Sequence, residues 1–138
     1  MRQSPSKIAA LWKRAALTTL ATAKGLRESG DHRSCVSRAY YAAYQAATSV
    51  CITHGDDLSF PPGWSNPSHE QLPDLIRNNG DLTINTRRTV RMILRQVRSL
   101  REDADYRMGR TVDATSVRVA LPMASALFER LGIEDVDN

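Results

Sequence analysis

The stretch SRAYYAAYQAATSVC at residues 37–51 decides the fold of this chain. At about 100° per residue, its tyrosines, alanines and valines cover most of the circumference of a helix, and only the arc around Arg38 is polar. A helix this apolar needs neighbours on nearly every side, so we expect it at the centre of a bundle with its tyrosines in the core. It should begin after Asp31 and end near His54, because Gly55 is a natural C-terminal stop.

The rest of the sequence shows apolar residues at helical spacing, separated by short polar breaks, and no strand pattern of period two. We therefore predict an all-α fold, a single up-and-down bundle of about five helices that forms one domain over residues 1–138. The first expected helix begins at Ser4-Pro5 and is ended by the stretch from Gly25 to Gly30. A short helix runs to Asn78 from a cap at Asn66, or from a cap at Ser68 with Gln71 as its capping-box partner. The last two run from Ile84 to Tyr106 and from Ser116 to Leu131. A Pro- and Gly-rich loop at 55–67 and a frayed tail at 133–138 complete the prediction.

The composition excludes several classes of protein. The 138 residues are 41% hydrophobic and 25% charged, as in ordinary globular domains. No window approaches the roughly eighteen apolar residues of a membrane span, and Lys13 and Arg14 interrupt the N-terminal apolar run, so we expect no membrane, no signal peptide and a cytoplasmic protein. Cys35 and Cys51 are expected as buried free thiols. Neither metal-ligand spacing nor a phosphate-binding loop occurs, so we expect neither a metal nor a cofactor.

The positive charge is concentrated on one predicted helix. The chain has a formal net charge of +4, but residues 84–101 hold six arginines and no acidic residue, which leaves −2 for the rest. On a helical wheel the six arginines fall within about 140°, beside the apolar stripe. We call them the arginine face: Arg87, Arg88, Arg91, Arg95, Arg98 and Arg101.

Three interpretations of the arginine face are open. Its side chains can extend over the bundle and pair with acids of neighbouring helices. They can bind the phosphates of RNA or another polyanion, because guanidinium groups make bidentate phosphate contacts and stack on unpaired bases. They can also contact an acidic protein. A basic surface provides affinity without sequence selectivity, so the pattern does not identify a particular RNA.

Two further features lie near the arginine face. Charges of both signs crowd residues 101–107, and charge complementarity suggests that Arg38 of the central helix pairs with one of the acids there. His69 opens a short helix, whose N-terminal field disfavours the imidazolium and should lower the pKa of this side chain. A neutral histidine beside the arginine face is a candidate general base.

Two motifs resemble those of the HEPN domains (higher eukaryotes and prokaryotes nucleotide-binding), most closely the small stand-alone prokaryotic ones. The first motif is S-R-x-Y-Y-A at residues 37–42, on the central helix. The second is R-x-x-A-D-Y at residues 101–106, and His69 lies between the two motifs, after the long loop. The resemblance covers about residues 8–131, nearly the whole chain.

This resemblance implies a helical bundle that often dimerises and that acts in RNA metabolism, toxin–antitoxin pairs or phage defence, frequently beside a minimal nucleotidyltransferase. Ribonucleases of the family carry R-x4-6-H at the end of the fourth helix, and two protomers combine their copies in one metal-independent site. Here the fifth to seventh residues after Arg101 are Tyr106, Arg107 and Met108, so the histidine is missing. A tyrosine, with an ordinary pKa of about 10, is a poor general base at neutral pH.

The preferred hypothesis is an RNA- or nucleotide-associated HEPN-like protein, a homodimer, that forms part of a toxin–antitoxin or defence module. Its expected partners are RNA or a nucleotide, a second copy of the chain and a minimal nucleotidyltransferase. Its candidate nucleic-acid-binding residues are Arg38, Arg87, Arg91, Arg95, Arg98 and Asp105. One alternative is a metal-independent ribonuclease with an atypical site of Arg101, Tyr106 and His69. The other alternative is a non-catalytic protein-interaction module.

Overall fold

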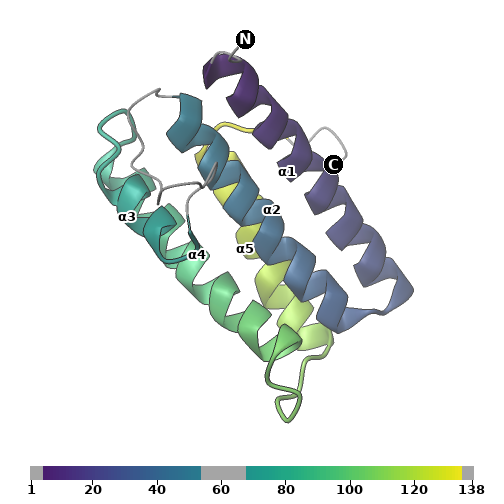
Figure 1. Cartoon of the computed structure of the whole chain (residues 1–138). Coiled ribbons are helices and arrows are strands. Elements are labelled where there is room, and N and C mark those ends of the chain that lie inside the picture. The colour runs from purple at the N-terminus through teal and green to yellow at the C-terminus, as the bar shows by residue number, and fades with distance from the viewer. Residues whose placement is uncertain (1–4, 54–67, 135–138) are drawn as a thin grey trace.

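Five helices form an up-and-down bundle in the computed structural model, which describes residues 5–53 and 68–134 (Figure 1). Their bounds are α1 Pro5–Ser29, α2 His32–Thr53, α3 Gln71–Arg77, α4 Ile84–Asp105 and α5 Ala114–Arg130. The four long helices alternate in direction, and the short α3 lies beside the start of α4. No strand occurs within the described ranges. The prediction of an all-α bundle of about five helices is therefore confirmed.

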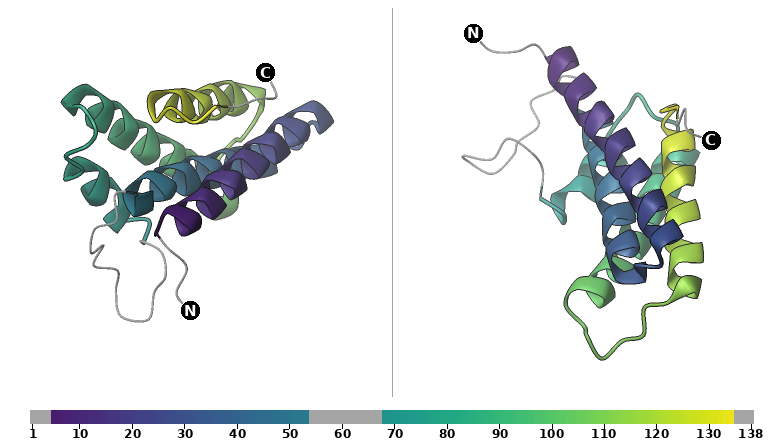
Figure 2. Two further views of the ribbon diagram at one scale, coloured as in Figure 1. Left: turned by 90° about the horizontal axis from the view of Figure 1, so that it is seen from above. Right: turned by 90° about the vertical axis from the view of Figure 1, so that its right-hand side faces the viewer.

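The helix α2 is the centre of the bundle, as its apolar circumference predicts. It contacts each of the four other helices, and in the view from above it lies between α1 and α4 with α5 across one side (Figure 2). Its alanines are fully buried, and their small side chains allow the neighbouring helices to approach closely. Tyr40 is its largest buried side chain. Cys35 and Cys51 are buried free thiols, as predicted.

Local capping explains where the helices begin and end. Gly30 has a φ of 81°, a conformation that suits glycine, and this allows the chain to reverse between α1 and α2. Before α3, the Ser68 hydroxyl accepts from the Gln71 N–H and the Gln71 side chain accepts from the Ser68 N–H, which is the predicted capping pair. Asp113 and Ser116 form a second capping box, so α5 begins two residues earlier than the sequence predicts.

The outer segments of the prediction differ in outcome. Ile133, which the sequence assigns to a frayed tail, is buried in the core, and its N–H donates to the Phe128 carbonyl in the turn after α5. The predicted loop at 55–67, His54, Ser4 and residues 135–138 lie outside the described residues. Among the helices that the structure describes, none is long and apolar enough to cross a bilayer.

Candidate functional site

Arg101, near the end of α4, is buried although it carries a charge. The residue is only 8% exposed, and its guanidinium donates three hydrogen bonds. Nε donates to Asp105 Oδ2 at 3.0 Å, one helical turn further along α4. Nη2 donates to the hydroxyl of Tyr41 on α2 at 2.8 Å and to the hydroxyl of Tyr106 at 3.0 Å. Arg101 therefore connects α2 to the end of α4.

Aromatic rings complete the surroundings of this guanidinium. Its central carbon lies 5.2 Å from the ring centre of Tyr41, 5.1 Å from that of Tyr106 and 5.7 Å from that of Tyr40. Each distance is within cation–π range. Burial by itself lowers the pKa of Arg101, but Tyr41, Tyr106 and Asp105 together raise it above its ordinary value, so the side chain stays charged. The sequence places Arg101 on a phosphate-binding face, whereas its Nε and Nη2 donate to partners inside the protein.

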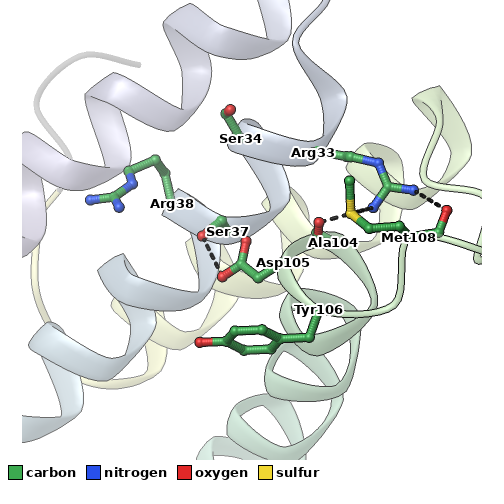
Figure 3. A pocket seen from close by; sticks show the side chains of 8 residues that line it. All are labelled: Arg33, Ser34, Ser37, Arg38, Ala104, Asp105, Tyr106 and Met108. Atoms are coloured by element: carbon green, nitrogen blue, oxygen red, sulfur yellow. Dashed lines mark hydrogen bonds between the residues drawn. The ribbon is translucent and has the colours of Figure 1, made fainter.

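A surface pocket of about 430 Å³ opens beside this cluster, between the start of α2 and the end of α4 (Figure 3). The Ser37 hydroxyl donates to Asp105 Oδ2 at 3.2 Å, so this oxygen receives hydrogen bonds from both helices. In Figure 3 the Tyr106 ring lies on one side of the pocket, and the Arg38 side chain extends from α2 at its edge, away from Ser37 and Asp105. The pocket is lined by Arg33, Ser34, Ser37, Arg38, Ala104, Asp105, Tyr106 and Met108.

The two arginines of α2 in this pocket have different tasks. Arg33 donates to the backbone carbonyls of Asp103, Ala104 and Arg110, at 3.2, 2.9 and 2.6 Å, and so holds the chain after α4 against α2. The guanidinium of Arg38 lies 5.0 Å from the ring centre of Tyr41 and is exposed. The predicted pairing of Arg38 with an acid at 101–107 is thus replaced by the Ser37–Asp105 hydrogen bond and by the carbonyl contacts of Arg33.

His69, in the turn before α3, packs on the tyrosines of α2. Its Nδ1 lies 2.5 Å from the Tyr40 hydroxyl, and its ring centre is 4.8 Å from that of Tyr44. Burial raises the pKa of Tyr40 above its ordinary value, so the phenol keeps its proton. The tautomer of His69 sets which of the two groups donates in this hydrogen bond.

The pKa of His69 is lowered, in the direction that the sequence predicts but for another reason. Burial is the largest cause, followed by the positive charges of Arg101 and Arg98. The sequence attributes the shift to the field of a helix N-terminus instead. His69 and Arg101 both contact Tyr40 and Tyr41, and Arg101 also contacts Tyr106. The three predicted catalytic residues, Arg101, Tyr106 and His69, therefore belong to one aromatic cluster.

The remaining arginines of the arginine face divide into two groups. Arg87 donates to the carbonyls of Leu82 and Arg77 near the start of α4. Arg98 pairs with Glu102 at 3.3 Å and approaches Glu70 at 4.0 Å.

Three arginines of the face have no such partner: among the carboxylates in the described part of the chain, none forms an ion pair with Arg88, Arg91 or Arg95. We call these three the outer arginines.

Five contributors to the site are not among its predicted residues: Arg33, Ser37, Tyr40, Tyr41 and Tyr44. Ser37, Tyr41 and Tyr44 recur at spacings of three and four residues along α2, and Arg33 precedes them on the same side of the helix. This spacing marks one helix face, and the two motifs at 37–42 and 101–106 together suggest that this face meets the end of α4. The described residues contain no cluster of acidic, histidine and cysteine side chains that could hold a metal ion.

Comparison with known proteins places this arrangement in a family. No curated protein and no solved structure matches the chain. The model of the HEPN domain family matches residues 9–134, which include both motifs, the aromatic cluster and all five helices apart from the first turn of α1. The chain therefore belongs to the HEPN domain family.

Proposed function

We propose that this protein binds RNA, with the phosphates held by the outer arginines Arg88, Arg91 and Arg95 and by Arg38. Membership of the HEPN family supports a nucleotide- or RNA-associated role in general. The observation that carries the proposal is that exposed Arg88 and Arg95 and half-buried Arg91 lie close together on α4, with no ion pair to a carboxylate among the described residues. Neighbouring arginines on one helix side repel each other, and an anionic ligand relieves this repulsion.

The roles of the six arginines differ from one another in this proposal. Arg101 orders the aromatic cluster, Arg87 caps backbone carbonyls and Arg98 is held by Glu102. The outer arginines and Arg38 remain for the ligand. Because guanidinium–phosphate contacts are independent of base identity, they supply affinity and position rather than sequence selectivity.

A salt-titrated binding assay tests the proposal. We expect a labelled single-stranded RNA to bind with an affinity that falls steeply with salt, and Arg91→Ala/Arg95→Ala to reduce the slope of log K against log salt by about 1.4. The matched control is Lys13→Ala/Arg14→Ala, which removes two exposed charges from α1. Absence of RNA binding at low salt, or an equal loss in both double variants, contradicts the proposal.

A second candidate function is RNA cleavage at Arg101 and Tyr106. The hydrogen bond of 3.0 Å between Nη2 and the Tyr106 hydroxyl favours it, because it brings the arginine and the residue at the position of the missing histidine together. Purified protein should then degrade total RNA without metal ions, and Tyr106→Phe should abolish the degradation. RNA that stays intact after long incubation with the wild-type protein excludes this function.

We further propose that the protein is a homodimer and that it belongs to a toxin–antitoxin or defence module with a minimal nucleotidyltransferase partner. HEPN domains often bind RNA and dimerise, and this supports the dimer. Light scattering of the purified protein tests its mass in solution. A toxin should inhibit growth when its expression is induced, so growth is compared between the wild type, Tyr106→Phe and Arg91→Ala/Arg95→Ala. Unimpaired growth with the wild type argues against a toxin.

A further inference from the structure

We propose that the pocket between α2 and α4 binds one unpaired guanine nucleotide, with the base on the Tyr106 ring and the phosphate on Arg38. The inference rests on the proposed RNA binding and specifies which part of an RNA the protein recognises. The volume of the pocket, about 430 Å³, lies within the range of small-ligand pockets. The residues that line it supply a cation, an aromatic face, two hydroxyls and a carboxylate.

Tyr106 is suited to stacking because its ring is exposed and its orientation is held. The residue is 68% exposed, which is unusual for a large aromatic side chain in a folded protein. Its hydroxyl accepts from Arg101, and the Arg101 guanidinium lies 5.1 Å from the ring centre. A ring that is already oriented loses little entropy when a base stacks on it. Stacking on an aromatic side chain does not depend on the identity of the base.

Asp105 supplies the discrimination between bases. Its Oδ2 receives the hydrogen bonds from Arg101 and Ser37, and among the hydrogen bonds of the described residues none uses Oδ1. Asp105 lines the pocket, and Figure 3 shows its carboxylate between Ser37 and the Tyr106 ring. An ionised carboxylate only accepts hydrogen bonds, so it favours an edge with donors and repels an edge with acceptors.

Guanine offers the best match to such an acceptor. Its Watson–Crick edge has two adjacent donors, the N1–H and the N2 amino group. Adenine and cytosine present one amino group beside a ring-nitrogen acceptor, and uracil presents one N–H between two carbonyl oxygens. These edges are available only when the base is unpaired, because pairing in a duplex occupies them. The pocket therefore selects single-stranded guanine over paired guanine and over uracil.

The phosphate end of the nucleotide lies toward Arg38. This guanidinium is exposed, lies over the Tyr41 ring and lines the pocket. Arg33 also lines the pocket, but its Nη1 and Nη2 donate to backbone carbonyls of residues 103–110. We therefore assign Arg33 a structural role in the pocket wall. The outer arginines continue along α4 toward its N-terminus, which provides a path for the phosphates of an attached RNA.

Mononucleotides test the pocket separately from the RNA-binding surface. GMP, IMP and UMP are titrated into the isotope-labelled full-length chain, and the amide signals of Ser37 and Tyr106 are followed by NMR. We expect GMP to bind more tightly than IMP, which lacks the N2 amino group, and IMP more tightly than UMP. Tyr106→Ala should weaken GMP binding about tenfold or more, and Tyr106→Phe, which keeps the ring, by only about threefold or less.

The outcomes separate this inference from the proposed function. GMP binding that survives in Arg91→Ala/Arg95→Ala, but not in Tyr106→Ala, supports the pocket. If GMP binds there and single-stranded RNA does not bind at all, the pocket stands and the RNA proposal is wrong. If RNA binds while the three nucleotides bind equally, or do not bind, the pocket inference is overturned. An unchanged GMP affinity in Tyr106→Ala also overturns it.

Discussion

Replacing Arg101 by alanine removes the charge that holds the end of α4 to α2. Of the three hydrogen bonds that are lost, those to Asp105 and Tyr41 involve partly buried groups, whereas Tyr106 is exposed and regains a bond to water. A hydrogen bond to a charged group contributes about 1.5–3 kcal/mol to stability. The Asp105 side chain is 27% exposed, so in the variant water replaces part of the interaction that Asp105 loses. We therefore expect Arg101→Ala to lower the free energy of unfolding by about 3 kcal/mol.

Two variants provide the comparison for this value. Arg101→Lys keeps the charge, but a single ammonium group does not reproduce the forked geometry of the three bonds, so we expect roughly half of the loss. Arg95→Ala removes an exposed arginine from the same helix and should change the free energy of unfolding by no more than about 0.5 kcal/mol. Urea denaturation followed by circular dichroism measures all three at one protein concentration, so that any self-association affects them equally.

Equal free energies of unfolding for Arg101→Ala and Arg95→Ala would contradict the expected loss. A double-mutant cycle with Asp105→Asn makes the test specific to the pair. Because Arg101 and Asp105 are joined by a bond of 3.0 Å, the two substitutions should be coupled by about 1 kcal/mol or more. Additive effects would mean that the loss in Arg101→Ala comes from its other contacts, the bond to Tyr41 and packing, and not from Asp105.

Three further predictions concern other parts of the molecule. The pKa of His69 in the folded protein lies below its ordinary value of 6.5. As the pH falls, His69 is therefore protonated in the unfolded chain before it is protonated in the folded protein. The contribution of His69 to stability should be complete above pH 6.5 and decline below it. Urea unfolding of the wild type and His69→Gln at several pH values checks this, and an equal pH dependence in both proteins contradicts it. Cys35 and Cys51 should not react with a thiol reagent at mildly alkaline pH until the protein unfolds, because burial raises the pKa of both thiols, that of Cys51 to about 12; rapid labelling of the native protein would show that they are accessible. Arg33→Ala should accelerate amide hydrogen exchange at residues 106–110 more than elsewhere, since Arg33 donates to carbonyls in and next to this segment; a uniform acceleration would indicate a global loss of stability instead.

The place of Tyr106 bears on how far the chemistry of HEPN ribonucleases extends to this chain. The residue lies beside Arg101, where the family resemblance puts a histidine, and its hydroxyl accepts a hydrogen bond from the guanidinium. Tyrosine is less suited than histidine to general acid–base catalysis near neutrality. An exposed ring next to a fixed charge is suited to binding a base. This arrangement supports the proposed recognition of a base by Tyr106.

The sequence alone determined the helices and the order of the bundle. Hydrophobic spacing and capping residues are local signals, so the predicted bounds agree closely with α2 and α4, and the Asp113 cap explains the earlier start of α5. The central position of α2 also follows from its sequence, because a helix that is apolar on most sides has to be covered. The concentration of arginines on α4 is likewise visible in the printed sequence.

The role of each charged residue depends on neighbours from other helices. On the wheel, Arg101 falls between Val90 and Leu94, within the apolar arc, so a local signal for its burial existed. Whether a charge is tolerated there depends on partners from other elements, and Tyr41 of α2 provides one. The pKa of His69 also depends on other elements, because it is lowered by burial and by arginines of α4 rather than by the N-terminus of α3. Pairing and burial are set by neighbours in space, which helical spacing does not encode.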